Sequence, residues 1–153
     1  MSGFVAGGTV TSGQLVSDPF WPAIDLDQVR ARLRIDSSVS TDKLRAAVVA
    51  AAITVNRELA GYRDDQIIKG YATLAAVPGP MVDGISERIH LYLRAIDAAT
   101  AAEVAERYRS YDSTGRGDKE AEALTPTIDE YRRDQRWAIS DLQGLPRTTV
   151  ELI

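Results

Sequence analysis

Apolar residues recur at helical spacing along most of this chain. The most regular series, between residues 42 and 69, advances in steps of three and four residues and predicts one long amphipathic helix. It consists of Leu44, Val48, Ala51, Val55, Leu59 and Tyr62. At ~1.5 Å per residue this helix would be roughly 42 Å long. Ser40 or Thr41 is expected to cap its start, and Gly70 is expected to end it.

Two further helices flank this one in the sequence. A short N-terminal helix is predicted from Asp25, as its N-cap, to about Ile35. A long helix is predicted from residue 84 or 86 to residue 111, and its broad apolar stripe favours a central position in the fold. The intervening residues 71–82 contain Pro78, Gly79 and Pro80, which predict a loop.

The last predicted helix has clear start and stop signals. Thr125 is the expected N-cap with Pro126 in the first turn, and Gly144 is the expected stop. Trp137 lies roughly 140° around the helix from the apolar stripe, at ~100° per residue. We therefore expect Trp137 to contact a second surface.

These elements predict an all-α fold. It is a bundle of three long helices plus one short N-terminal helix, with an extended N-terminal arm and a short C-terminal β-prone tail. Residues 1–19, rich in Gly, Ser and Thr, form the arm, residues 20–147 the helical domain, and residues 148–153 the tail.

Composition narrows the class of protein. The 153 residues are 44% apolar and 26% charged, which fits one globular domain. With no Cys, a disulfide framework, a thiolate zinc site and a cysteine nucleophile are excluded. A net charge of -4 disfavours a general nucleic-acid coat. No apolar run approaches the ~20 residues that span a bilayer, so no membrane partner is expected.

Candidate catalytic chemistry is sparse. The sequence contains no phosphate-binding loop, dinucleotide fingerprint, HExxH or GxSxG motif. His90 is the only histidine, and the carboxylates lie on helix faces beside basic residues. An enzyme that uses His90 with nearby carboxylates is therefore the weakest hypothesis. We predict no catalytic residue, no metal site and no cofactor.

Arginines are the better candidates for function. Arg30 and Arg34 belong to one cluster, and Arg133 and Arg136 lie beside Trp137 in another. Either these clusters are solvated faces with salt bridges, or they pair with another subunit or partner. Because Trp and Arg dominate interface hot spots, the second hypothesis assigns all five residues to a subunit or partner interface.

The C-terminal tail and one loop are the remaining candidates. The tail residues Thr149, Val150, Glu151, Leu152 and Ile153 have no predicted sheet in this chain to join. They either lie along their own helices or add as a strand to a partner. The loop before the last helix contains Gly115, Arg116, Gly117, Asp118 and Lys119.

Several short motifs together resemble one known family. They include Glu106-Arg107-Tyr108-Arg109, Gly117-Asp118-Lys119, Thr127-Ile128-Asp129-Glu130, Arg133-Asp134, Arg136-Trp137-Ala138 and Pro146-Arg147. Near the start, Phe20, Pro22, Ile24-Asp25 and Val29-Arg30 continue the match. The pattern, from about Phe20 to Ile153, resembles the head-completion protein family (gpL type) of contractile-tailed phages.

The resemblance implies a structural, non-enzymatic connector subunit. Such a subunit would form a homo-oligomeric, dodecameric ring beneath the portal protein, stabilise the DNA-filled head and offer a docking surface for neck or tail-terminator proteins. Residues 149–153 would then dock on the portal, and residues 115–119 would face the lumen, with its packaged DNA, or a neck partner. The implied location is the virion neck, after assembly in the host cytoplasm. The alternative is a helical DNA-binding regulatory protein that uses the Arg30–Arg34 helix.

Overall fold

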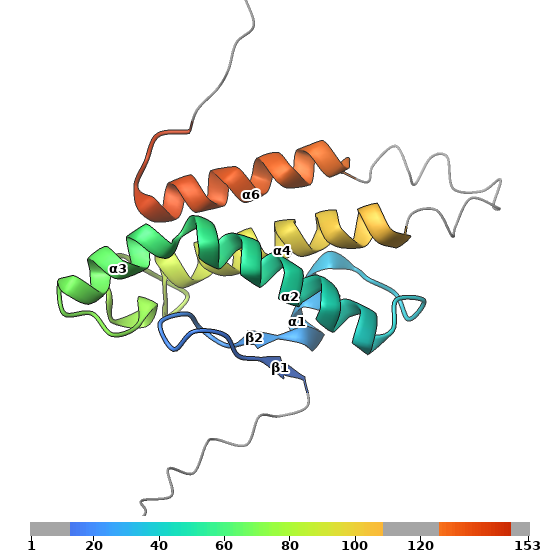
Figure 1. Cartoon of the computed structure of the whole chain (residues 1–153), viewed down its shortest axis with the longest axis horizontal. Coiled ribbons are helices and arrows are strands. Elements are labelled where there is room, and N and C mark those ends of the chain that lie inside the picture. The colour runs from blue at the N-terminus through green and yellow to red at the C-terminus, as the bar shows by residue number, and fades with distance from the viewer. Residues whose placement is uncertain (1–12, 109–125, 148–153) are drawn as a thin grey trace, which may run out of the picture.

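A computed structural model of the chain describes residues 13–108 and 126–147 (Figure 1). In these ranges it contains five α-helices, one short 3-10 helix and two small sheets. The helices are α1 Leu26–Leu33, α2 Thr41–Glu58, α3 Ala60–Ile68, η1 Leu74–Ala76, α4 Glu87–Tyr108 and α6 Ile128–Gln143. The strands are β1 Gln14–Leu15, β2 Ile24–Asp25, β3 Met81–Val82 and β4 Ile85–Ser86.

Helix α4 occupies the centre of the bundle. It packs against α6 on one side and α2 on the other, with α1 against its second half (Figure 1). Ala95, Ala99 and Ala102 of α4 are completely buried, and their small side chains let the neighbouring helices approach closely. On α2 the predicted stripe is confirmed, because Leu44, Val48, Ala51, Val55 and Leu59 are all buried.

Side-chain caps define where three helices begin. The Asp25 carboxylate accepts hydrogen bonds from the backbone N–H groups of Asp27 and Gln28 at the start of α1. Ser40 caps α2 in the same way. Thr127 and Glu130 form a reciprocal capping box on α6.

The predicted ends of two helices are wrong by two residues. Thr127 caps α6, so Pro126 precedes the helix instead of entering its first turn, and Thr125 lies outside the described residues. Helix α1 stops at Leu33 because Arg34 adopts a left-handed conformation, with a φ of 54°. A non-glycine residue in that conformation gives no sequence signal for a helix end.

The prediction of three long helices is also wrong. Residues 42–69 form α2 and α3 instead of one helix, and the break falls at Leu59, whose φ and ψ are -93° and 6°. The Leu59 N–H still donates to the Val55 carbonyl at 3.0 Å, so the interruption is a single residue. Gly61 follows in the first turn of α3 and lowers the helix propensity there.

The all-α prediction fails at the N-terminal segment. Strand β1 pairs antiparallel with β2, with Gln14 opposite Asp25 and Leu15 opposite Ile24. Leu15 and Ile24 are both buried. Residues 13–19 of the predicted arm are thus packed on the bundle, and residues 1–12 lie outside the description.

A second sheet lies where a loop and the start of a helix were expected. Strands β3 and β4 form a hairpin in which Val82 pairs with Ile85. The two turn residues, Asp83 and Gly84, have φ values of 53° and 70°. Positive φ at both central positions is what a tight two-residue hairpin turn requires, and Asp-Gly is a preferred sequence for it.

Candidate interaction surfaces

Trp137 lies beneath two guanidinium groups. The Arg133 guanidinium carbon is 4.7 Å from the centre of the Trp137 ring, and that of Arg147 is 4.8 Å away. Such contacts are attractive because the ring face carries partial negative charge. The surface that Trp137 contacts therefore includes arginines of its own chain, from one turn earlier on α6 and from the segment after it.

Arg147 is held in this position by Asp141. Two hydrogen bonds join their side chains, from Nε at 3.1 Å and from Nη2 at 2.7 Å. The Arg147 guanidinium lowers the pKa of the Asp141 carboxyl. Together with the Trp137 contact, this pair fixes Arg147 and the segment after α6 on the bundle. Residues 148–153 lie outside the described residues.

The arginines of α1 make contacts within the molecule. Arg30 donates from Nη1 to the carbonyl oxygens of Ile35, at 3.4 Å, and Asp36, at 2.8 Å. Arg32 makes a bidentate pair with Asp97 on α4, at 2.6 and 3.0 Å, and these bonds raise the pKa of the Arg32 guanidinium. Arg34 remains exposed at the end of α1. Because Arg30 and Arg32 bind their own chain, this helix is poorly suited to reading DNA.

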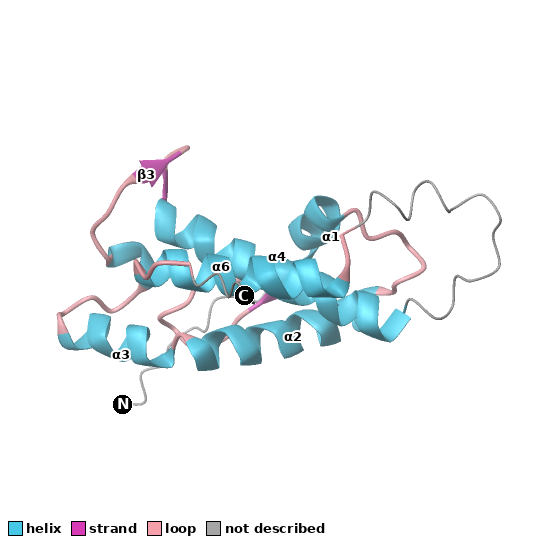
Figure 2. Ribbon diagram, turned by 90° about the horizontal axis from the view of Figure 1, so that it is seen from above, coloured by secondary structure: helices cyan, strands magenta, loops and turns pink. Residues whose placement is uncertain are grey.

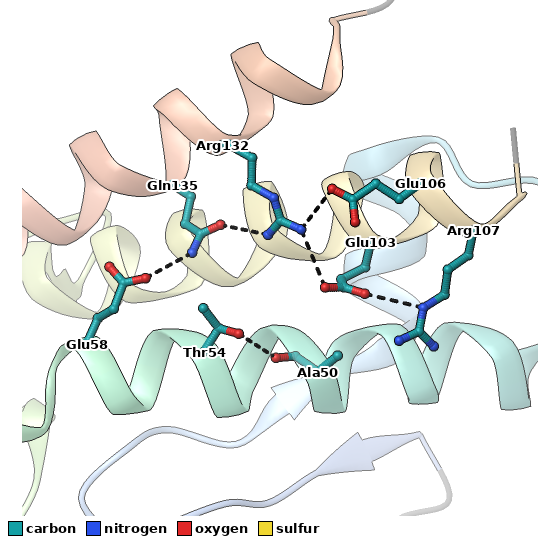
Figure 3. A network of polar contacts seen from close by, with 8 residues as sticks. All are labelled: Ala50, Thr54, Glu58, Glu103, Glu106, Arg107, Arg132 and Gln135. Atoms are coloured by element: carbon teal, nitrogen blue, oxygen red, sulfur yellow. Dashed lines mark hydrogen bonds and ion pairs between the residues drawn. The ribbon is translucent and has the colours of Figure 1, made fainter.

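A polar network joins α2, α4 and α6 (Figure 3). At its centre, Arg132 of α6 donates to Glu103 at 3.5 Å and to Glu106 at 3.1 Å, both on α4. Gln135, which is buried, accepts from Arg132 and donates to Glu58 of α2 at 3.5 Å. Sequence spacing did not indicate this network, which fixes α6 on the other two helices.

Another polar contact ties the N-terminal segment to the central helix. The Tyr92 hydroxyl donates to the Asn56 side-chain oxygen at 2.7 Å. Asn56 in turn donates to the Ser17 hydroxyl at 3.1 Å. Burial raises the pKa of the Tyr92 hydroxyl, which therefore stays protonated. This chain of bonds fixes residues 13–19 against α2 and α4.

Large apolar side chains of the described residues are exposed at several places, including Ile67 and Ile68 at the end of α3 and Leu145 after α6. Two further groups lie on the hairpin and on the outer face of α2. Met81, Val82 and Ile85 project from the β3–β4 hairpin. Val16, Val49 and Ile53 border a groove of about 400 Å³ between β1 and α2. Helix α4 covers one face of α2, whereas the outer face of α2 keeps Val49 and Ile53 exposed.

His90 has a structural contact. Its Nε2 lies 2.8 Å from the carbonyl oxygen of Val82, and because a carbonyl only accepts, Nε2 donates. This bond holds the hairpin on α4. In the described parts of the chain, no three His, Asp or Glu side chains gather as metal ligands. Nor does any helix there have the length and apolarity to cross a membrane.

Comparison with known proteins gives the family. The sequence profile of the phage head completion protein (GPL) family matches residues 15–153, which include every described element except Gln14, the first residue of β1. The chain belongs to this family of phage head completion proteins. A relative, the head completion/stabilization protein of Escherichia phage P2, is 41% identical over 134 residues, covering 88% of this chain and 79% of the relative. No solved structure matches.

Membership of the head completion family confirms the resemblance drawn from the sequence motifs. The predicted interface residues lie in three places. Arg133 and Trp137 form one surface with Arg147. Arg136 is exposed next to Trp137 on α6. Arg30 lies on α1, and Arg34 follows the end of that helix. Residues 115–119 and 149–153 lie outside the described ranges. The assignments of all these residues stay predictions.

Proposed function

We propose that this head completion protein is a non-enzymatic subunit that forms a ring beneath the portal, stabilises the DNA-filled head and provides the docking surface for neck or tail proteins. The observation that carries the proposal is the family match over residues 15–153. The name of the phage P2 relative, head completion/stabilization protein, supports the same role.

The distribution of exposed side chains supports assembly into a ring. A closed ring is built from heterologous contacts, in which each subunit offers two different faces. The exposed apolar residues of the hairpin and of the α2 groove form two such faces. The α6 surface of Arg133, Trp137 and Arg147 adds a third face that is available to the portal or to a neck protein.

A phage that lacks the protein tests the proposal directly. We expect heads that package DNA but lose it to nuclease, and few joined tails, and we expect plasmid-encoded wild-type protein to restore both. Electron microscopy would count filled heads and tailed particles. Normal DNA retention and normal tail joining without the protein would contradict the proposal.

The predicted docking of the tail on the portal has its own test. Replacing residues 148–153 by a Gly/Ser segment of the same length should abolish binding to purified portal rings. Reversing the charge of exposed Asp65 on α3 serves as the control. Unchanged portal binding after the replacement would remove the tail from the interface and leave the head-completion role intact.

A further inference from the structure

The β3–β4 hairpin is a rigid apolar projection. Met81, Val82 and Ile85 are 64%, 54% and 43% exposed. The hairpin is held on α4 by the bond from His90 Nε2 to the Val82 carbonyl and by a bond from the Glu87 N–H to the Pro80 carbonyl at 3.0 Å. An ordered projection with an apolar end has the features of a docking element, because nothing in residues 13–108 and 126–147 covers it.

The groove between β1 and α2 is a complementary cavity. Its apolar wall is made by Leu15, Val16, Val49, Ala52 and Ile53. Its volume of about 400 Å³ lies within the range of small-ligand pockets, so it has room for the side chains at a hairpin tip. The walls are fixed by the bond from Asn56 to Ser17 and by a bond from Arg45 to the Gln14 carbonyl at 3.3 Å.

The two features face different sides of the molecule. Figure 2 shows β3 projecting from the side of the bundle away from α2 and α3. The hairpin packs on α4, whereas the groove lies on the outer face of α2. A hairpin therefore cannot reach the groove of its own chain, but it can reach that of a second copy.

Charge supports the same pairing. Arg45, Val49, Ile53 and Arg57 follow one another at four-residue spacing, so they form a single stripe on α2 with a basic residue at each end. The hairpin carries the exposed Asp83 at its tip, and the exposed Glu87 follows β4. An acidic tip and a basic-ended apolar stripe complement each other.

We propose that the β3–β4 hairpin of one copy inserts into the β1–α2 groove of the next copy, with Val82 and Ile85 against Val49 and Ile53. The contact is heterologous, so each copy uses its hairpin toward one neighbour and its groove toward the other, and repetition closes a ring or continues as a chain. This inference deepens the proposed ring function by naming its subunit contact.

Disulfide trapping tests the contact cleanly, because the chain contains no cysteine. A double Val82→Cys/Ile53→Cys variant, oxidised mildly both as concentrated purified protein and inside assembled particles, should give a ladder of cross-linked dimers, trimers and larger species. Mixing the two single variants should give dimers only. The matched control is Val82→Cys with Asp65→Cys, which places the second thiol on exposed α3 and should give no ladder.

A charge in the groove provides an independent variant. A second trapping pair, Ile85→Cys with Val49→Cys, leaves position 53 free for this change. Adding Ile53→Asp to that pair should reduce its ladder by about tenfold or more, because it buries a carboxylate in an apolar contact. Circular dichroism of Ile53→Asp should match the wild type, since Ile53 is exposed in the single chain.

Three results would overturn the inference. The first is no ladder from the double variant in either setting. The second is equally efficient dimerisation of Val82→Cys alone, which would mean that hairpins pair with each other. The third is cross-linking of Ile53→Cys to Val150→Cys within one chain, which would place the C-terminal tail in the groove. If particles contain the protein and are completed normally but give no ladder, the hairpin–groove contact is refuted and the proposed function is not. If the purified protein gives the ladder but is absent from particles, the proposed function is refuted and the contact is not.

Discussion

The rings of Trp21 and Tyr92 are stacked, with 3° between their planes and 4.8 Å between their centres. Trp21 belongs to the segment before α1, and Tyr92 belongs to the central helix α4. Phe20 packs edge-on against the same Trp21 ring, at 4.8 Å. The residues that precede the first helix are therefore part of the hydrophobic core, and the N-terminal segment contributes to the stability of the bundle.

Removing the Trp21 ring should be severely destabilising. We expect Trp21→Ala to lower the free energy of unfolding by about 3–5 kcal/mol, because it opens a cavity against Phe20 and Tyr92. Urea denaturation monitored by circular dichroism would measure the loss. Val16→Ala, at an exposed position in the same segment, should change stability by less than about 0.5 kcal/mol in the single chain. Similar small losses from both variants would show that the segment is not part of the core.

The Tyr92 hydroxyl should have a measurable effect of its own. Tyr92→Phe keeps the stacked ring but leaves the Asn56 side-chain oxygen without its 2.7 Å donor. We expect a loss of about 0.5–1.5 kcal/mol, the net contribution of a typical hydrogen bond, because Asn56 is half-buried. In a double-mutant cycle, the stability loss of the double variant should be smaller than the sum of the losses from Tyr92→Phe and Asn56→Ala. Full additivity would mean that the two side chains are not coupled.

The Asp141–Arg147 pair predicts a pH-dependent stability. Arg147 lowers the pKa of Asp141 in the folded protein, so the ionised pair stabilises the fold above about pH 5 and this contribution is lost as the pH falls below about 4. Asp141→Asn should therefore be less stable than the wild type at pH 7, and the difference should shrink at pH 3. Asp65→Asn, an exposed α3 control, should show no such convergence. Equal stability of Asp141→Asn and the wild type at neutral pH would contradict the prediction.

Trp137 should matter more for assembly than for folding. Its ring is half-buried and is covered by the guanidinium groups of Arg133 and Arg147, outside the apolar core. We expect Trp137→Ala to keep the helical circular dichroism spectrum but to weaken association with portal rings, as measured by co-sedimentation. Unfolding of the variant would instead make Trp137 a core residue, and unchanged association would remove it from the interface.

Local signals predicted much of the helical structure. Spacing of apolar residues found the buried stripe of α2, and the caps at Asp25 and Ser40 were visible as polar residues before apolar runs. The Asp83-Gly84 turn between apolar residues was an equally local hairpin signal that went unused. The break at Leu59 has only a weak local signal, the low helix propensity of Gly61 in the first turn of α3.

Contacts between distant segments could not be predicted from one sequence. The pairing of β1 with β2 depends on where residues 14 and 15 meet the bundle. Likewise, Arg132 meets Glu103 only because of the register between α6 and α4. The arginine clusters of the candidate surfaces were visible in the sequence. Only the fold shows that some of these arginines, such as Arg30 and Arg32, bind their own chain.

Electron cryomicroscopy of the neck of the assembled particle examines the proposed role of the protein without any perturbation. We expect a closed ring of this chain directly beneath the portal, with each hairpin seated in the groove of its neighbour. A neck in which the position beneath the portal is empty or held by another protein, with this chain absent from the particle, would contradict the proposed function.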